Sequence, residues 1–291
     1  MHIYPTKLVN IDIRVSDKKK GRILRSKLID RLVEEKKEKP VILGHRGIRK
    51  EIVPENTIAA FEEALKRGAS GIEIDVESTS DGNLIVINRW YLHSQFGFFP
   101  WEKSLETIQK LAEKKSIEIP TFFETCDFIK KKRNTIFNVE IKSSHRFVCQ
   151  TARKAVKIIH DYKIDAQVII SSFDINTLLT TRFFHRKIET AYLFRKVDRV
   201  VKLEDRNKLR YKVNSMINRT GIKGFFVGID SLHPEITLFP SSTEKEKNWM
   251  KVARWMGKRV NAWTVDTNED LSKAINAGVK IIISDKVKTV I

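Results

Sequence analysis

The stretch that decides the fold is Gly71-Ile72-Glu73-Ile74-Asp75-Val76, in which two acidic side chains alternate with apolar ones. Side chains alternate between the two faces of a strand, so Glu73 and Asp75 share one face while the apolar side chains pack on the other. Two like charges side by side in an apolar strand repel each other unless a positive group lies between them. A hard divalent cation with oxygen ligands meets this need. The stretch therefore predicts a buried strand that carries part of a metal site.

Similar β-rich runs recur along the chain, with helical patterns between them. Together they predict strands near residues 41–44, 71–76, 136–141, 168–172, 190–194, 224–229, 259–265 and 280–284. The clearest helices are expected at Thr57–Arg67, Ser104–Lys114, Cys126–Lys132, His145–Tyr162 and Glu269–Asn276. Eight strands that are buried on both faces and separated by helices are typical of a parallel (β/α)8 TIM barrel, which we predict as the fold.

One strand breaks this pattern. The run from Leu84 to Asn88 follows the second strand too closely for a crossover helix, and the link between them is Ser80-Asp81-Gly82-Asn83. Asp-Gly between two β-rich runs is a strong hairpin signal. We therefore predict a β-hairpin insertion after the second strand, with residues 84–88 antiparallel and Asn88 roughly opposite Glu73, beside the acidic cluster.

We divide the chain into a basic N-terminal extension, residues 1–40, and a barrel domain, residues 41–291. Within the extension, Arg22 to Lys37 has the apolar spacing of an amphipathic helix, and Pro40 ends it. The sequence leaves open whether this segment packs across the bottom of the barrel or meets a membrane surface.

The composition is that of a globular protein with a full core: 291 residues, 41% hydrophobic and 31% charged. No apolar stretch approaches the ~20 residues needed to cross a bilayer, and the first residues lack an apolar signal core. Cys126 and Cys149 have no metal-binding spacing, and we expect buried thiols in a reducing compartment. These features predict a cytoplasmic protein.

The net charge of +19, with an isoelectric point of about 9.8, is the one extreme value. Lysines and arginines are spread along the whole chain, and no zinc-finger, RNA-recognition or basic-helix signature accompanies them. We therefore expect no specific binding of nucleic acid. Attraction of an anionic substrate and peripheral contact with an anionic membrane both stay open.

Polar residues gather at the predicted carboxyl ends of the first three barrel strands, where barrel enzymes place their active sites. They are His45 and Arg46, then Glu73 and Asp75, then Glu140 and Lys142. Any one of these carboxylates could simply pair with a lysine or arginine, which this chain has in excess. Together, with a histidine and an arginine beside them, they indicate a catalytic site.

Several motifs occur in one order over residues 41–287. They are His45-Arg46-Gly47, Pro54-Glu55-Asn56-Thr57, Ile72–Val76 with Thr79 and Asp81-Gly82, Ile119-Pro120-Thr121, Val139-Glu140-Ile141-Lys142, Ser171-Ser172-Phe173, Ala262–Asp266 and Gly278–Asp285. In residues and order this set resembles the glycerophosphodiester phosphodiesterases, a far more specific match than any single short pattern.

The resemblance implies a barrel enzyme that hydrolyses glycerophosphodiesters to glycerol 3-phosphate and an alcohol. It also implies one divalent cation, Mg²⁺ or Ca²⁺, held by Glu73, Asp75 and Glu140, which agrees with the charge argument. The metal would stabilise the transition state, and Arg46 and Lys142 are suited to phosphate oxygens.

Two further residues have competing interpretations. Glu55 is expected either to ligate the metal or to orient Arg46, and its motif also fits the start of a helix. Trp263, near a strand end, is expected either to line the substrate pocket or to be a buried core indole.

The chain departs from the family at one catalytic position. The family has two histidines, and His45 matches the first, which acts as general base or nucleophile. The second normally ends the hairpin strand in a His-Asp pair, where this chain has Asn88 and Arg89. Asparagine can hydrogen-bond a phosphate oxygen but cannot deliver a proton near neutral pH. Arg89 is expected to bind phosphate.

Three other histidines are candidates for the lost role: His93, His145 and His233. Each competes with an ordinary surface or core function. We place His93 in the catalytic set because its segment follows the hairpin and could fold over the mouth of the barrel.

We therefore predict a metal-dependent phosphodiesterase for glycerophosphodiesters or lysophospholipid head groups, with metal binding retained and turnover lowered or altered. The alternative is a catalytically impaired relative that binds a phosphorylated or lipid ligand. The sequence does not determine the alcohol moiety, the preferred metal, the oligomeric state, or whether a substrate hydroxyl attacks to give a cyclic phosphate.

Overall fold

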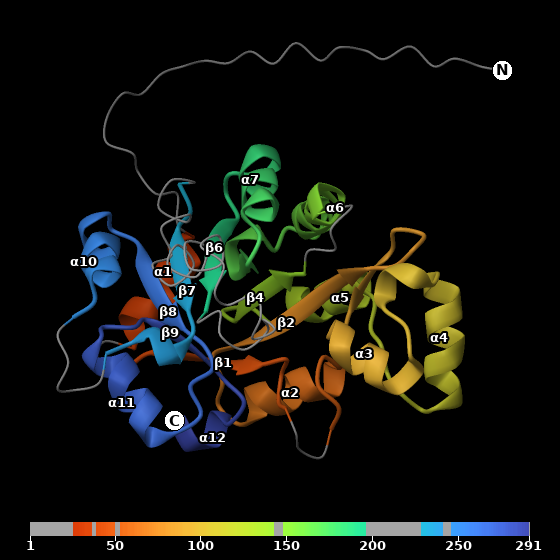
Figure 1. The fold of residues 1–291 in the computed structure, drawn as a ribbon, viewed down its shortest axis with the longest axis horizontal. Helices are drawn as coiled ribbons and strands as arrows, with labels where there is room; N and C mark the ends of the chain where they lie inside the picture. The colour runs from red at the N-terminus through yellow and green to blue at the C-terminus, as the bar shows by residue number, and fades with distance from the viewer. Residues whose placement is uncertain are drawn as a thin grey trace, which may run out of the picture.

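The strands of the chain close into a barrel in the computed structural model, which describes residues 26–36, 39–49, 53–142, 148–195, 228–240 and 246–290. The parallel strands in this part of the chain are β1 (Val41–His45), β2 (Gly71–Ser78), β4 (Ile136–Ile141), β5 (Val168–Ser172), β6 (Glu189–Phe194), β7 (Ser231–Pro234), β8 (Arg259–Ala262) and β9 (Ile281–Ser284). Each pairs with the next in this order, and β9 pairs back with β1. The predicted (β/α)8 barrel is confirmed (Figure 1).

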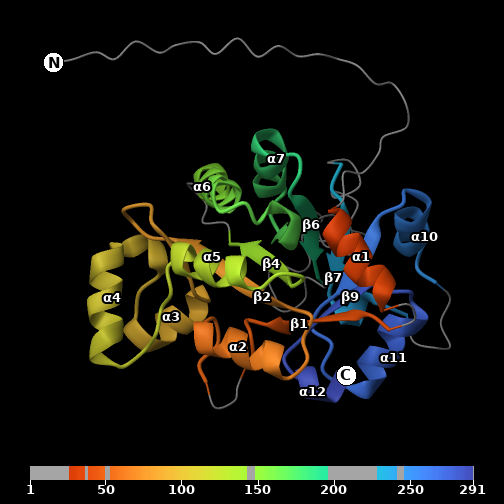
Figure 2. The same cartoon turned by 180° about the vertical axis from the view of Figure 1, so that it is seen from behind.

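Helices surround the barrel and connect successive strands (Figures 1 and 2). They are α2 (Ile58–Lys66), α5 (Phe122–Lys131), α6 (Val148–Asp161), α7 (Ile175–Phe184), α10 (Asn248–Trp255), α11 (Asn268–Asn276) and the short α12 (Val287–Val290), with the 3-10 turns η2 (Asp165–Gln167) and η5 (Ile236–Leu238). Their apolar faces and the outward side chains of the strands form the main hydrophobic core. None of the described helices is both long and apolar enough to span a bilayer.

Helix α1 (Lys27–Glu35) lies across the amino-terminal end of the barrel (Figure 2). Its Ile29 is fully buried and joins the inward-facing apolar side chains of the strands. Ser26 caps the helix and also donates a hydrogen bond to the carbonyl of Ala166, just before β5. The sequence left open whether the N-terminal extension packs across the bottom of the barrel or meets a membrane surface. The described part of the extension packs across the bottom of the barrel. The division of the chain at residue 40 stays a prediction, and residues 1–25 lie outside the described residues.

The segment after β2 forms a lobe at one end of the molecule (Figure 1). Strand β3 (Leu84–Val86) pairs antiparallel with β2, and α3 (Arg89–Phe96), η1 (Pro100–Glu102) and α4 (Leu105–Lys114) follow. Apolar side chains from β3, α3 and α4 make a small core of their own. The insertion is therefore larger than the hairpin that the sequence predicts.

Several predicted boundaries need correction. Helix α5 begins at Phe122, four residues early, because Thr121 and Glu124 form a capping box there. Strand β8 ends at Ala262 rather than at residue 265. For the predicted strand at 224–229, residues 224–227 lie outside the described residues, and β7 begins at Ser231.

Candidate active site

A cavity of about 630 Å³ opens at the carboxyl ends of the barrel strands. Its polar lining includes His45, Arg46, Arg49, Glu73, Asn88, Arg89, Asn138, Glu140, Lys142, Arg195, Glu235, Asp266 and Asp285. Its apolar wall includes Trp90, Phe173, Leu193, Ile236 and Trp263. This is the end of a barrel at which active sites are built.

The three predicted carboxylates converge beside this cavity. Glu73, Asp75 and Glu140 are buried and offer oxygen atoms that all lie within 4.8 Å of one another. The strand register brings them together, because Asp75 lies directly opposite Glu140 and Glu73 is two residues before Asp75. The alternation that predicted a shared face for Glu73 and Asp75 thus places both against the third carboxylate.

Two positively charged side chains, Lys142 and Arg46, lie among these carboxylates. The Lys142 ammonium is 2.8 Å from Asp75 Oδ1 and 2.5 Å from Glu140 Oε1, and Arg46 Nε is 2.9 Å from Asp75 Oδ2. Burial alone would raise the pKa of Asp75, but Lys142 and Arg46 hold it well below its usual range. Burial would likewise lower the pKa of Lys142, but Asp75 and Glu140 raise it. Both groups therefore stay charged.

Glu73 is the least neutralised of the three carboxylates. Its Oε2 accepts a hydrogen bond of 3.0 Å from the backbone N–H of Arg46, and its Oε1 has no hydrogen-bond partner among the described residues. Burial, followed by the charge of Asp75, raises the pKa of Glu73 to about 8. A buried oxygen without a partner, next to two more carboxylates, is a donor set that fits Mg²⁺ or Ca²⁺.

His45, at the end of β1, is held by a carboxylate that the sequence analysis did not assign a role. Its Nδ1 is 2.6 Å from Asp285 Oδ1, and its Nε2 is 3.8 Å from Glu73 Oε2. Burial would lower the pKa of His45, but the hydrogen bond to Asp285 and the charge of Glu73 outweigh it and raise the pKa. Asp285 directly follows β9. Its position at the carboxyl end of a barrel strand is the sequence signal that could have identified it as a site residue.

Glu55 pairs with Arg46 and is not one of the three clustered carboxylates. Its Oε1 accepts from Arg46 Nη1 at 2.6 Å, and its Oε2 accepts from Arg49 Nε at 2.8 Å. Arg49, which had no sequence signal, also reaches Asp285 at 3.3 Å. Gly47 lets this turn close, because its φ is +81° and a Cβ there would lie 2.6 Å from the backbone of Ala60.

Asn88 is bonded on both sides of its amide. Its Nδ2 donates to Asp75 Oδ2 at 2.9 Å, and its Oδ1 caps α3 by accepting from the backbone N–H groups of Trp90 and Tyr91. The predicted pairing opposite Glu73 is therefore wrong: strand β3 ends at Val86, and Asn88 starts a helix beside Asp75.

Arg89 lines the cavity but is engaged by the protein. Its guanidinium pairs with the buried Glu77 and lies 5.0 Å from the centre of the Trp101 ring. Burial raises the pKa of Glu77 to about 7 against the opposing effect of Arg89.

The structure does not bring a second histidine to the described cavity wall. His93 is exposed on α3 and stacks on Phe99, with ring centres 4.5 Å apart. His233 is fully buried on β7, and its Nε2 lies 2.7 Å from Asn261 Nδ2. His145 lies outside the described residues. Trp263 lines the pocket, and its Nε1 donates to the carbonyl of His233 at 2.7 Å.

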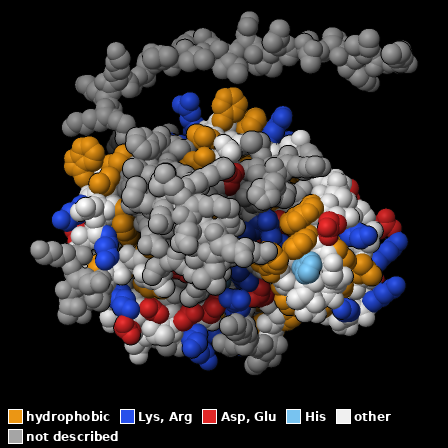
Figure 3. Space-filling view, in the orientation of Figure 1, with side chains coloured by type: hydrophobic (Ala, Val, Ile, Leu, Met, Phe, Trp, Pro, Cys, Tyr) orange, Lys and Arg blue, Asp and Glu red, His pale blue; other side chains and the backbone are white. Residues whose placement is uncertain are grey.

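The described lysines and arginines are scattered over the face of the molecule shown in Figure 3 rather than gathered in one patch. Acidic side chains lie between them on the same face (Figure 3). The part of this face that the structure describes carries no continuous basic stripe of the kind that tracks a nucleic-acid backbone.

A barrel with three clustered carboxylates, a histidine, an arginine and a lysine at the carboxyl ends of its strands is the arrangement expected of a hydrolase of phosphoric esters. The family model described as the glycerophosphoryl diester phosphodiesterase family matches residues 45–289. A glycerophosphodiester phosphodiesterase from Caldanaerobacter subterraneus is 32% identical over 264 residues, covering 87% of this chain and 97% of that protein. The chain belongs to this family, and the prediction of a phosphoric diester hydrolase is confirmed.

Solved structures show the same fold. A putative glycerophosphoryl diester phosphodiesterase from Silicibacter pomeroyi has a TM-score of 0.65 at 19% identity, covering 87% of this chain and 92% of that chain. An Oleispira antarctica phosphodiesterase in complex with the product sn-glycerol-3-phosphate has a TM-score of 0.65 at 18% identity, covering 86% of this chain and 95% of that one.

Proposed function

We propose that the protein hydrolyses glycerophosphodiesters to glycerol 3-phosphate and an alcohol, with the help of one divalent cation, Mg²⁺ or Ca²⁺. The observation that carries this proposal is the convergence of Glu73, Asp75 and Glu140 beside His45 and a cavity at the catalytic end of the barrel. The Caldanaerobacter relative is named for the same activity, which supports the choice of substrate.

The residues that would hold the metal are Glu73, Asp75 and Glu140. When bound, the cation supplies positive charge that stabilises the developing negative charge on the phosphoryl oxygens. Among the described residues, Glu73 Oε1 and Asp75 Oδ1 are buried oxygens of this set without a hydrogen-bond partner, and Asp75 Oδ1 is already ion-paired with Lys142.

His45 is the proton-transfer group. Asp285 accepts a hydrogen bond from its Nδ1, which leaves the lone pair of Nε2 free on the Glu73 side. The imidazole can therefore take a proton from an attacking hydroxyl or act as a nucleophile at phosphorus. Arg46, held by Glu55, presents guanidinium donors next to the same space.

Asn88 leaves the departing alcohol without a strong acid. Its amide lies where a proton donor is needed but cannot donate one to an alkoxide near neutral pH. Losing one acid–base partner typically costs about 10² to 10⁴ in rate. We therefore propose a turnover below that of a two-histidine enzyme, and greatest for substrates whose leaving group needs no proton.

A second candidate function is binding of a phosphorylated or lipid ligand without turnover. Asn88 is the observation that favours it, together with an apolar cavity wall that includes Trp90 and Phe173. Both aromatic side chains are exposed, by 67% and 39%, and they would suit the acyl or glycerol part of a lysophospholipid.

Release of glycerol 3-phosphate from glycerophosphocholine, with Mg²⁺ or Ca²⁺ and after chelation, tests the proposal. We expect metal-dependent release that His45→Ala and Glu73→Gln both abolish. Unchanged activity in His45→Ala would refute the catalytic assignment. A thermal shift with glycerol 3-phosphate but no release from any phosphodiester would establish the second candidate instead.

A further inference from the structure

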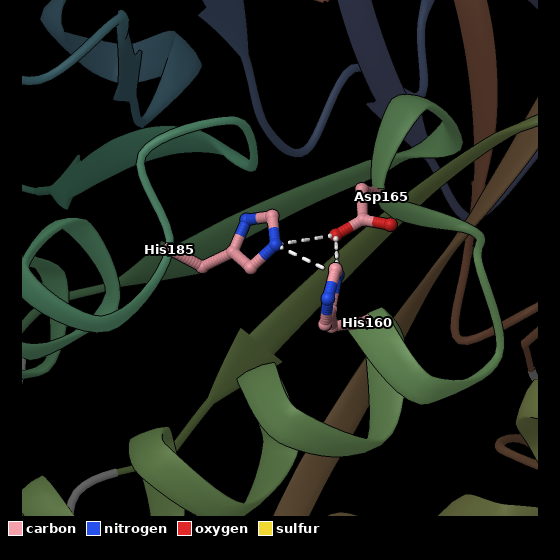
Figure 4. Close-up of side chains that lie close together, drawn as sticks. All are labelled: His160, Asp165 and His185. Carbon is pink, nitrogen blue, oxygen red and sulfur yellow. Dashed lines mark hydrogen bonds and ion pairs between the residues drawn. The ribbon is translucent and has the colours of Figure 1, made fainter.

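A second group of metal-ligating side chains lies on the outside of the barrel, away from the cavity. It consists of His160, Asp165 and His185, which we call the His-Asp-His cluster (Figure 4). His160 is in the last turn of α6, Asp165 begins η2 before β5, and His185 follows α7 directly. All three precede strands, so the cluster lies toward the amino-terminal end of the barrel, opposite the active site.

Three ligand atoms of the cluster lie close together (Figure 4). His185 Nε2 is 2.8 Å from His160 Nδ1 and 3.0 Å from Asp165 Oδ1, and His160 Nδ1 is 3.2 Å from Asp165 Oδ1. In a tetrahedral zinc site with bonds of about 2.0–2.1 Å, ligand atoms are about 3.3 Å apart. The triangle is therefore within a few tenths of an ångström of one face of such a tetrahedron.

Hydrogen bonds alone cannot satisfy this triangle. Each of its three edges is short enough for a hydrogen bond and needs one donor and one acceptor. Asp165 Oδ1 can only accept when it is ionised. If both histidine nitrogens donate to it, two N–H groups face each other along the edge between the histidines. If one of these nitrogens is unprotonated, its lone pair faces the lone pairs of Asp165 Oδ1. A cation placed over the triangle removes this conflict, because all three atoms can then direct lone pairs at it.

The surroundings also favour a cation. Helices α6 and α7 both end at the cluster, and the carboxyl end of a helix carries partial negative charge. The side chains of Asp165 and His185 are 20% and 13% exposed and thus held in place, while that of His160 is 62% exposed and leaves one side open to solvent. Water can therefore reach a fourth coordination position.

We propose that the His-Asp-His cluster is a binding site for Zn²⁺ or a chemically similar divalent transition metal. Two imidazole nitrogens and one carboxylate oxygen suit zinc, cobalt or nickel, whereas Mg²⁺ and Ca²⁺ prefer oxygen ligands alone. The bound metal links the end of α6 to η2 and to the end of α7, so it stabilises this side of the barrel and takes no part in phosphodiester hydrolysis.

Titration with Co²⁺, followed by visible absorption, tests the site in the full chain. We expect one Co²⁺ with the intense absorption of four-coordinate, nitrogen-ligated cobalt, and Zn²⁺ should displace it. His160→Ala, at an exposed position, should lower the affinity at least tenfold while the apo protein keeps its melting temperature. His93→Ala is the matched control, because it removes an exposed histidine outside the cluster.

A further variant separates this site from the acidic cluster. Glu140→Gln should leave the nitrogen-ligated Co²⁺ spectrum unchanged, whereas His185→Ala should remove it. Zn²⁺ should raise the melting temperature of Glu140→Gln, in which the acidic cluster is disabled, but not that of Glu140→Gln combined with His160→Ala. The proposal would be overturned if the nitrogen-ligated Co²⁺ spectrum survived in His160→Ala. It would also be overturned if Glu140→Gln bound neither Co²⁺ nor Zn²⁺.

Discussion

Replacing Asn88 by histidine should restore the missing acid and raise the turnover of glycerophosphodiesters. The side chain lines the cavity and lies 2.9 Å from Asp75, next to the cluster of carboxylates. An imidazole on the same backbone would extend further into the cavity than the amide does. If it protonates the leaving alcohol, we expect kcat for glycerophosphocholine to rise by about 10²- to 10⁴-fold, which is about 3–5 kcal/mol of barrier.

The same substitution should cost stability by an amount that the structure indicates. Asn88 Oδ1 caps α3 through the N–H groups of Trp90 and Tyr91, and loss of such a cap costs about 1 kcal/mol. Loss of the hydrogen bond to the Asp75 carboxylate adds about 1.5–3 kcal/mol unless the imidazole replaces it. Urea unfolding should therefore show a loss of about 1–4 kcal/mol.

Two controls isolate proton transfer from other effects. Asn88→Ala removes the cap and the hydrogen bond without adding an acid, so it should lose stability and gain no rate. With bis(4-nitrophenyl) phosphate, whose leaving group needs no proton, wild type and Asn88→His should turn over at similar rates. A folded, metal-binding Asn88→His with no gain on glycerophosphocholine would refute the assignment of position 88 as the missing acid.

Three further predictions follow from the same contacts. Asp285→Asn should lower kcat by about 10²-fold with little change in the melting temperature, because an amide that accepts from Arg49 turns its NH2 group toward His45 Nδ1 and favours the wrong tautomer; equal kcat in steady-state assays would contradict this. Burial, with the charge of Arg259, lowers the pKa of His233 in the folded protein to about 3. As the pH falls below about 6.5, the imidazole of His233 is therefore protonated in the unfolded state but stays neutral in the folded state. Stability should therefore fall by about 1.4 kcal/mol per pH unit between about pH 6.5 and pH 3 through this group, and urea unfolding from pH 7 to 5 should show a shallower slope for His233→Asn than for wild type. Ile29→Ala should cost about 2–5 kcal/mol in urea unfolding, since this fully buried side chain closes the bottom of the barrel; a loss under about 1 kcal/mol would show that α1 adds little to the core.

Much of the active site could be predicted because its residues follow local rules. Glu73 and Asp75 share a face because strand side chains alternate, and Glu140 occupies the same position on a neighbouring parallel strand. Apolar runs of strand length, separated by helical patterns, were enough to indicate the barrel. The hairpin was also visible in the Asp-Gly turn. The helix that Asn88 caps was not, because an asparagine after an apolar run is compatible with both a strand end and a helix cap.

The sequence by itself determined the barrel and the inward-facing carboxylates, because each of these depends on neighbours within a few residues. The loss of a second catalytic histidine at Asn88 stays a prediction from the family resemblance. Only the tertiary structure decided the partner of His45, since Asp285 lies 240 positions away and arrives there when β9 pairs with β1. It alone likewise assembled His160, Asp165 and His185 from the ends of three elements. Contacts of this kind depend on how the closed barrel packs, and no local spacing encodes them.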